Sequence, residues 1–208
     1  MKALKTPNIM NQPSNQKVKS LNNFNYYSDK ISADHLKKIK KWCGESKNLE
    51  RHNNRLAGFI QDQYLLDDES KDLVLPYIYD GANTLSGRLV NWYCSSAWVN
   101  YQKKYEVNPL HSHTGQLSFV MWINIPYDLN EELNLSYVKD STLKHCATAF
   151  TLVCGNNNGT IRQLPFRLDK TSEGEFIIFP AELFHMVYPF YTSDGYRISI
   201  AGNLKVKN

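Results

Sequence analysis

The stretch GEFIIFPAELFHMVYP, residues 174–189, indicates the fold of this 208-residue chain more directly than any other segment. Its first half is a short β-prone run that ends at Pro180, where a turn is expected. His185 follows at the point where the next strand should start. Arg197 follows twelve residues after His185, and residues 196–199 (YRIS) begin a further β-prone run. The stretch therefore predicts neighbouring strands that carry a histidine and an arginine close to one site.

Short β-prone runs continue through the second half of the chain, separated by turn signals such as Asn108-Pro109 and the segment 155–159 (GNNNG). Many short strands at nearly even spacing indicate an antiparallel sandwich or barrel with helices packed outside. We therefore expect a mainly β fold with flanking helices. The runs are 98–101, 117–125, 147–154, 160–166, 175–179 and 197–204.

Two of these runs differ in pattern. Residues 117–125 are apolar at nearly every position, so both faces of that strand should be covered. Residues 197–200 alternate instead, with Arg197 and Ser199 on the face opposite the two isoleucines. Such a strand could lie at a sheet edge with its polar face in water. In a jelly roll, the same polar face would line an internal cavity.

The first part of the chain differs from the second half in composition and in expected secondary structure. Residues 1–22 are rich in Asn, Gln, Lys, Ser and Pro, which predicts a flexible basic tail. We expect one domain over 23–208, with a helical first part over 23–90 and a β core over 91–208. Pro76 should end or kink the second of its helices.

Helices are expected at 32–42, where Ser32 can cap the first turn, and at 69–85. A further apolar pattern runs over 56–64. Residues 130–144 are polar, which predicts a surface loop or insertion.

Charge and composition limit the partners. The net charge of +4 comes from four lysines in the first 20 residues, so the remainder is formally neutral. The tail could touch nucleic acid, but the sequence shows no stripe of aromatic and basic residues typical of single-strand binders. No segment has the apolar length of a membrane span or a signal peptide. The four cysteines lack CxxC spacing, which favours reduced thiols in a cytoplasm.

Three histidines could form a metal site. In a strand, His111 and His113 point to the same side because side chains repeat every two residues. His185 could complete a set of three facial ligands. Non-haem Fe(II) enzymes use such a set, usually with two histidines and one carboxylate. An HxH pair alone is weak evidence, and a lone histidine among aromatic residues is more often part of the core.

Arg197 strengthens the metal interpretation. A guanidinium can bind a carboxylate through two parallel hydrogen bonds, and the Ser199 hydroxyl can add a third. The alternative for Arg197 is an ordinary surface ion pair. A hydrolytic zinc site could also use three histidines and a water, but it would not need an anchor for a dicarboxylate.

In the order and spacing of these motifs, the chain resembles the Fe(II)/2-oxoglutarate-dependent dioxygenase superfamily, and most of all the oxygenases found in bacteriophage genomes. The resemblance covers roughly residues 92–208. It rests on the segments 98–101 (WVNY), 108–113 (NPLHSH), 117–120 (LSFV), 174–190 and 197–203 (RISIAGN).

The resemblance implies a double-stranded β-helix, or jelly-roll, core with iron at its mouth. The family's metal ligands would correspond to His111, His113 and His185. Arg197 and Ser199 would hold the cosubstrate. We also expect Tyr101 and Asn203, which lie in matching segments, to contribute to cosubstrate binding.

His113 departs from the family pattern, in which this position is usually a carboxylate. Either the iron has three histidine ligands, or His113 lies outside the ligand set and two histidines hold the metal. Glu106 and Asp128 are the conceivable replacement acids, although neither has the expected spacing.

If the resemblance holds, the chain hydroxylates a substrate with Fe(II) and 2-oxoglutarate, releasing succinate and CO2. Trp98, Tyr101 and Trp122 could wall the pocket, or could simply be core residues. The substrate could be a protein side chain, a nucleobase or a small metabolite, and the oligomeric state is open. If the chain is phage-encoded, the location would be the host cytoplasm.

Two other functions remain open. One is a cupin-like three-histidine metal enzyme, although Glu182 stands where the second cupin motif has a glycine. The other is a catalytically inactive jelly-roll module that binds a partner, which the missing carboxylate would favour.

Overall fold

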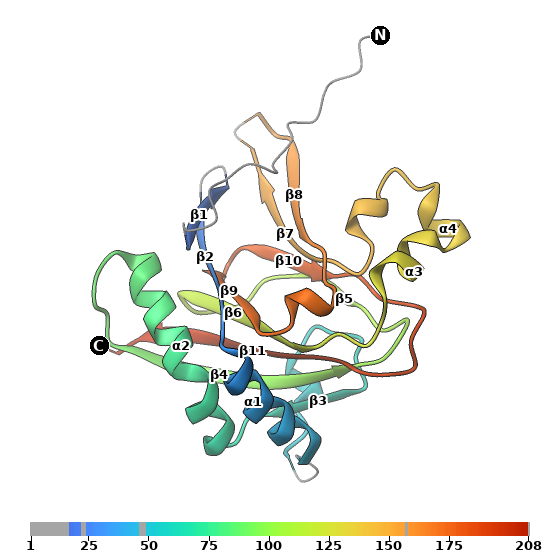
Figure 1. Ribbon diagram of the computed structural model, residues 1–208. Coiled ribbons are helices and arrows are strands. Elements are labelled where there is room, and N and C mark those ends of the chain that lie inside the picture. The colour runs from blue at the N-terminus through green and yellow to red at the C-terminus, as the bar shows by residue number, and fades with distance from the viewer. Residues whose placement is uncertain (1–16, 22–23, 46–48, 157, 208) are drawn as a thin grey trace.

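Two antiparallel sheets face each other in the computed structural model, which describes residues 17–21, 24–45, 49–156 and 158–207 (Figure 1). The larger sheet has the strand order β1 (Val18–Leu21), β2 (Phe24–Lys30), β9 (Glu175–Pro180), β6 (Leu117–Asn124), β11 (Arg197–Val206), β4 (Trp92–Gln102) and β3 (Asp62–Leu65). The smaller sheet has the order β5 (Asn108–His111), β10 (Phe184–Val187), β7 (Phe150–Gly155) and β8 (Ile161–Phe166).

Two longer helices, α1 (Ala33–Glu45) and α2 (Asp68–Ser86), cover the outer face of the larger sheet (Figure 1). The expected loop at 130–144 instead contains the short helices α3 (Leu129–Asn134) and α4 (Ser136–Lys139). Three 3-10 turns complete the elements: η1 (Asn53–Arg55), η2 (Lys144–Cys146) and η3 (Lys170–Ser172).

The apolar strand β6 separates two hydrophobic clusters, as its pattern predicts. Phe119 and Met121 face the helices, where they pack with residues such as Ile78. Val120 and Trp122 face the smaller sheet and pack between the two layers. Burying each such side chain contributes about 1.5–3 kcal/mol, so a strand apolar on both faces suits only the middle of the fold.

The mainly β jelly roll is confirmed, and all six expected β runs lie in or overlap strands. The turn expected at Asn108-Pro109 is instead the start of β5, which pairs with β10. Because β5 lies at the edge of the smaller sheet, the missing N–H of Pro109 can be accommodated there.

Strand β11 lies between β6 and β4, so the interpretation of residues 197–200 as an edge strand is wrong. Ile198 and Ile200 pack toward the helices. Arg197 and Ser199 point the opposite way and line a cavity between the sheets. This is the jelly-roll alternative that the alternating pattern allows.

The expectation of a helical first part over 23–90 is wrong for two segments. Residues 24–30 form β2, and the apolar pattern over 56–64 ends in β3 rather than in a helix. Both strands gain their stability from distant partners, since β2 pairs with β9 and β3 with β4. Tertiary pairing of this kind overrides local propensity.

The expected flexible tail over 1–22 is tested only in part. Residues 18–21 form strand β1, which pairs with β2 as a hairpin, so the expectation is wrong there. Residues 1–16 and 22 lie outside the described residues. Of the helices in the described part of the chain, none is long and apolar enough to cross a membrane. The described residues also form no disulfide.

Helix α2 continues past Pro76, so the helix does not end at the proline, one of the two outcomes expected there. The Asp67 carboxylate accepts a hydrogen bond from the Ser70 N–H at 2.8 Å and caps the first turn. Gly87 ends the helix in the left-handed region with a φ of 65°. Gly81 faces the sheet so closely that an added Cβ would lie 2.7 Å from Ile178. Caps and packing together offset the backbone bond lost at the proline.

Candidate metal centre and cosubstrate cavity

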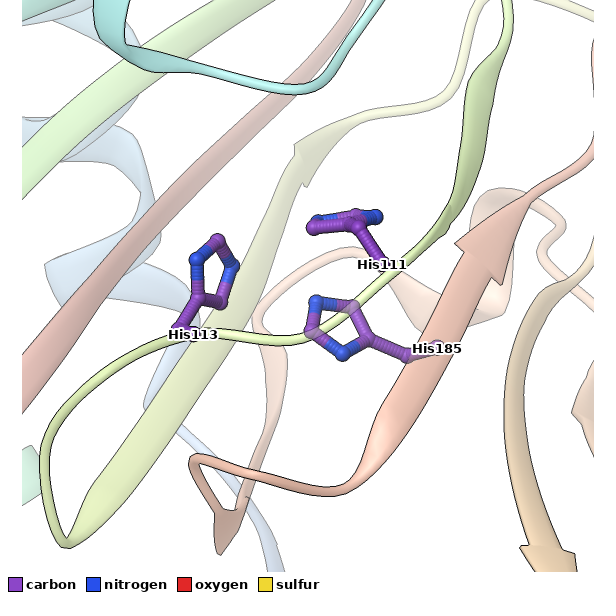
Figure 2. Close-up of side chains that lie close together, drawn as sticks. All are labelled: His111, His113 and His185. Carbon is purple, nitrogen blue, oxygen red and sulfur yellow. The ribbon is translucent and has the colours of Figure 1, made fainter.

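The pairing of β5 with β10 brings two of the predicted ligands together. His111 and His185 stand directly opposite each other in this antiparallel pair, and their ring centroids are 4.2 Å apart. Opposed residues in an antiparallel pair place their side chains on the same face of the sheet. The imidazoles therefore share one side of the smaller sheet, the side that faces the larger sheet (Figure 2).

His113 lies just beyond β5 and completes the cluster. Its backbone N–H donates to the Ala181 carbonyl at 2.9 Å, which holds this segment beside the β9–β10 turn. Its ring lies 4.9 Å from that of His111 and 5.0 Å from that of His185. The Trp98 indole packs against the other side of the His113 ring at 5.5 Å.

Backbone carbonyls orient two of the three rings. His111 Nδ1 donates to the Pro109 carbonyl at 2.6 Å, and His185 Nδ1 donates to the Leu183 carbonyl at 2.9 Å. A carbonyl oxygen can only accept, so each Nδ1 carries the proton and each Nε2 keeps its lone pair. Second hydrogen bonds of this kind are usual for histidines that bind metals.

Burial keeps the three imidazoles uncharged. It lowers the pKa of His185 to about 3, assisted by the charge that His111 would carry. Burial also lowers the pKa of His113 to about 4, again with a contribution from His111, and lowers the pKa of His111 itself. Since metal binding needs the deprotonated ring, all three are ready to bind an ion at neutral pH.

The donor set fits a divalent metal ion. The three histidines each offer one nitrogen, and these nitrogens lie within 4.8 Å of one another. No carboxylate belongs to this group among the described residues. The Glu106 carboxylate instead accepts from the Lys103 N–H at 2.8 Å, and that of Asp128 caps α3. Neither alternative acid therefore reaches the cluster.

Arg197 is buried and its guanidinium is held by four residues. Nε and Nη2 donate to the Gln102 Oε1 atom at 3.0 and 2.8 Å. Nη2 also donates to the Tyr188 carbonyl at 2.6 Å, while Nη1 donates to the Thr148 carbonyl at 2.7 Å and to Tyr127 Oη at 3.2 Å. These contacts use all five N–H donors of the side chain.

The pairing of β4 with β11 explains the position of Gln102, which stands opposite Arg197. A single amide oxygen accepts from the two donors that form one edge of the guanidinium fork. A carboxylate binds this edge with two parallel hydrogen bonds. The Gln102 side chain therefore stands where the carboxylate of a cosubstrate would bind.

Ser199 lies on the same face of β11 and belongs to a polar chain. Its Oγ accepts from Asn100 Nδ2 at 3.1 Å, and Asn100 Oδ1 accepts from Gln63 Nε2 at 2.8 Å. Asn100 and Gln102 are cavity residues that our sequence analysis did not identify. Side chains repeat every two residues along a strand, so Asn100 and Gln102 lie on the same face of β4 as Trp98. Applying this alternation to Trp98 would have identified both residues.

Two predicted cosubstrate residues lie elsewhere. Tyr101 is on the opposite face of β4, where its hydroxyl donates to the Cys43 carbonyl of α1 at 2.8 Å, so its predicted roles in the pocket are wrong. Asn203 is buried and its Oδ1 accepts from Ser118 Oγ at 2.7 Å. It lines an outer cleft rather than the cavity that contains Arg197.

The three histidines, together with Arg197 and Ser199, line an inner cavity of about 40 Å³. Trp98 and Trp122 form part of its wall, one of the two roles left open for them, together with Phe150 and Phe179. This volume holds about one water molecule, which is less than a dicarboxylate needs. The residues are suitable for 2-oxoglutarate, but its binding requires the cavity to open.

The fold also brings together aromatic and basic side chains that are distant in sequence. Tyr105 packs against Tyr191 at 5.7 Å, and the Lys104 ammonium lies 5.6 Å from the Tyr105 ring. Aromatic and basic side chains can therefore lie together in the fold although the sequence shows no stripe of such residues. However, Lys104 pairs with Asp194 at 2.7 Å, which neutralises its charge.

Comparison with known proteins identifies a family. Residues 96–203 match the sequence profile of a family described as "Putative 2OG-Fe(II) oxygenase". No curated protein matches the chain significantly.

Solved structures share the fold at low sequence identity. A prolyl-4-hydroxylase from Pseudomonas putida is 12% identical, with a TM-score of 0.56 over 88% of this chain and 93% of that chain. The carbocyclase SnoK from nogalamycin biosynthesis is 12% identical, with a TM-score of 0.58 over 88% of this chain and 79% of that chain. HygX from Streptomyces hygroscopicus, solved with nickel and 2-oxoglutarate bound, is 8% identical, with a TM-score of 0.51 over 86% of this chain and 81% of that chain.

Proposed function

The chain belongs to the 2OG-Fe(II) oxygenase family, and from that premise we propose that His111, His113 and His185 hold the iron while Arg197 anchors 2-oxoglutarate. The enzyme is an oxidoreductase that uses Fe(II) and 2-oxoglutarate. When bound, these two would activate O2, so that one oxygen atom hydroxylates the substrate and the other enters succinate as 2-oxoglutarate loses CO2. The observation that carries the proposal is the cluster of three uncharged imidazoles beside a buried arginine.

The histidines bind the metal through neutral nitrogens. His111 and His185 keep their Nε2 lone pairs because their Nδ1 protons are held by backbone carbonyls. A centre with three imidazoles carries one more positive charge than the usual set with a carboxylate. We therefore expect it to bind the anionic cosubstrate strongly, since the ligands do not neutralise the ion.

Among the described residues, Arg197 supplies the only charge on the inner cavity wall, where it can pair with the distal carboxylate of 2-oxoglutarate. For this pairing, the carboxylate replaces the Gln102 amide oxygen at the Nε and Nη2 edge. The other three hydrogen bonds of the guanidinium stay in place and keep the fork aimed at the cavity. The Ser199 hydroxyl, now held by Asn100, is positioned to donate to the same carboxylate.

The aromatic wall protects the reaction from water. Trp98, Trp122 and Phe150 surround the histidines and leave little space for solvent. A dry cavity strengthens the Arg197–carboxylate pairing and prevents the oxidant from reacting with anything except the substrate. The related structures act on proteins and on small molecules, and we propose a small-molecule substrate below. The phage origin and the cytoplasmic location stay predictions.

Iron binding by histidine variants tests the proposal. Under anaerobic conditions the parent chain should bind one Fe(II), measured by equilibrium dialysis and metal analysis. His111→Ala and His185→Ala should each weaken binding at least about tenfold, as lost metal interactions typically do. His145→Ala is the matched control, because His145 is exposed on η2 and belongs to no metal cluster. Undiminished iron affinity in His185→Ala would contradict the proposed centre.

A further inference from the structure

A second, larger cavity opens beside the metal centre. This outer cleft has a volume of about 490 Å³. Trp98 and His113 line both the outer cleft and the inner cavity, so the cleft leads directly to one of the proposed iron ligands. The remaining lining residues are His52, Arg55, Leu56, Leu65, Leu66, Lys71, Cys94, Ser95, Ser96, Ala97, Thr114 and Asn203.

The charged side chains of the outer cleft are all basic. Arg55 and Lys71 line it, and no acidic side chain of the described residues does; His52 also lines it, and burial lowers its pKa. Among the described residues, the Arg55 side chain forms no ion pair or hydrogen bond. Within the described part of the chain, the Lys71 ammonium forms one ion pair, with Asp68 at 3.1 Å, and that aspartate side chain is 99% exposed. An exposed pair of this kind is worth at most about 1 kcal/mol, so an anionic ligand can replace Asp68.

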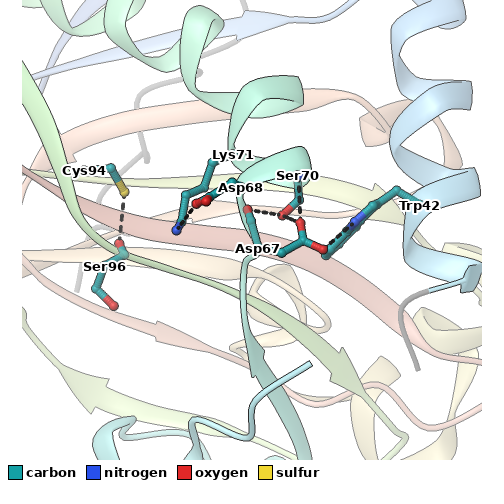
Figure 3. Close-up of polar contacts among 7 residues, drawn as sticks. All are labelled: Trp42, Asp67, Asp68, Ser70, Lys71, Cys94 and Ser96. Atoms are coloured by element: carbon teal, nitrogen blue, oxygen red, sulfur yellow. Dashed lines mark hydrogen bonds and ion pairs between the residues drawn. The ribbon is translucent and has the colours of Figure 1, made fainter. Parts of the chain in front are cut away.

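Lys71 is one of the residues that line the cleft. Figure 3 shows it on the first turn of α2, near Cys94 and Ser96 of β4, which line the same cleft. The Cys94 thiol donates to the Ser96 carbonyl at 3.4 Å. Burial raises the pKa of Cys94 to about 11, so the thiol adds no negative charge that could compete for Lys71.

The rest of the cleft wall is mixed, because Ser95, Ser96, Thr114 and Asn203 line it beside apolar side chains. Leu56, Leu65 and Ala97 line it together with the Trp98 indole. Its volume lies within the range of about 300–1,000 Å³ that is usual for small-molecule sites, and such sites combine apolar walls with a few polar groups. The apolar part of the lining can pack against an apolar body of a ligand, and the two basic side chains can pair with one anionic group.

We propose that the outer cleft binds the substrate, and that the substrate is a small molecule with an apolar body and a carboxylate or phosphate group. Arg55 and Lys71 would pair with the anionic group, while the body would lie against Trp98 and reach toward His113. This inference rests on the proposed function, because it takes His113 to mark the reacting centre.

Binding of simple probes to the full-length, metal-free chain tests the charge preference. The probes are 3-phenylpropionate, 2-phenylethyl phosphate and the neutral 3-phenylpropanamide, measured by calorimetry or by NMR line broadening. Both anions should bind at least about fivefold more tightly than the amide, which corresponds to about 1 kcal/mol for one ion pair near a surface. The tighter of the two anions identifies the head group as a carboxylate or a phosphate.

Substitutions locate the effect in the cleft. Arg55→Gln and Lys71→Gln should each remove most of the preference for the anion and leave the affinity for the amide unchanged. Arg88→Gln and Lys139→Gln are matched controls, since both residues are exposed and neither lines the cleft. Equal affinity for the anions and the amide in the parent would overturn the proposal, as would equal losses in the controls.

A paramagnetic ion tests whether the cleft serves the metal centre. With Mn(II) in place of Fe(II), the protons of a bound probe should relax faster than with Zn(II), because His113 borders the cleft. Displacement of the probe by 2-oxoglutarate would instead identify the cleft as the cosubstrate site and overturn the inference. Binding of a single-stranded oligonucleotide through Arg55 and Lys71, without binding of either anion, would also overturn it. If the metals fail to bind while the charge preference holds, the proposed function fails and the anion site stands.

Discussion

Gln102 should control access of 2-oxoglutarate to Arg197. Its amide oxygen accepts from Nε and Nη2 of the guanidinium at 3.0 and 2.8 Å, which is the edge that a carboxylate would use. The cosubstrate must therefore displace Gln102 before it can bind. Gln102→Ala removes the competitor, while Gln102→Glu replaces it with a carboxylate that pairs more strongly with the same edge.

The size of the effect follows from these two bonds. A hydrogen bond to a charged group contributes about 1.5–3 kcal/mol. Water will partly replace the lost amide in Gln102→Ala, so we take the lower end of that range for the two bonds together. The expected gain in 2-oxoglutarate affinity is then about tenfold, since 1.4 kcal/mol corresponds to a factor of ten. Gln102→Glu should weaken binding by at least a similar factor.

Calorimetric titration of 2-oxoglutarate into the Ni(II)-loaded proteins measures both effects without turnover. Gln163→Ala is the matched control, because Gln163 is exposed on β8 and does not line the cavity. The opposite signs expected for the two Gln102 variants distinguish competition from a general loss of structure. If both variants bind 2-oxoglutarate like the parent, Arg197 is a structural residue and its assignment as the anchor is wrong.

Three other perturbations have definite expected outcomes. His113→Asp should bind Fe(II) at least as tightly as the parent, because the carboxylate adds a negative charge. His113→Ala should lose about tenfold in Fe(II) affinity, measured by dialysis. If the Fe(II) affinity of His113→Ala is unchanged, His113 is not a metal ligand. In the folded, metal-free chain the pKa of His185 is about 3, which is below the value of 6.5 in the unfolded chain, so the unfolded chain gains the proton first as the pH falls. His185 alone should therefore lower the free energy of unfolding by about 2 kcal/mol between pH 7 and pH 5, and the loss should end near pH 3. Urea titrations of the parent and of His185→Gln check this loss. Glu132→Gln should lower the free energy of unfolding by about 1.5–3 kcal/mol in the same urea titration, because the buried Glu132 carboxylate accepts from the N–H groups of Tyr191 and Thr192. The affinity for 2-oxoglutarate should stay unchanged. Unchanged stability would show that the charge of Glu132 is not needed there.

The sequence pattern is sufficient for the β core and for the metal cluster. Alternation along 197–200 and the continuous apolar run over 117–125 follow directly from which faces of β11 and β6 are buried. The histidines could be grouped because two of them repeat at strand spacing and the third follows a recognisable turn. The exact register that places His111 opposite His185 depends on distant pairing and is not visible in the sequence.

The failures have a common cause. Strands β2 and β3 form because the larger sheet offers partners that lie far away in sequence, and β1 forms by pairing with β2, so local composition could not reveal them. Tyr101 was assigned to the cavity without regard to strand alternation, which places it on the helix-covered face. Arg55 of η1 and Lys71 of α2 line the same outer cleft, and only the folded structure shows that they lie on one cavity.

The most direct test of the central claim is an anaerobic titration of the Fe(II)-loaded protein with 2-oxoglutarate and with 2-oxopentanoate, which lacks the distal carboxylate. The visible charge-transfer band of an iron-bound keto acid should appear with 2-oxoglutarate and saturate at one per iron. With 2-oxopentanoate it should require a concentration at least about tenfold higher, because Arg197 then has no carboxylate to bind. Absence of the band with iron demonstrably bound, or equal affinity for the two keto acids, would contradict the proposed site.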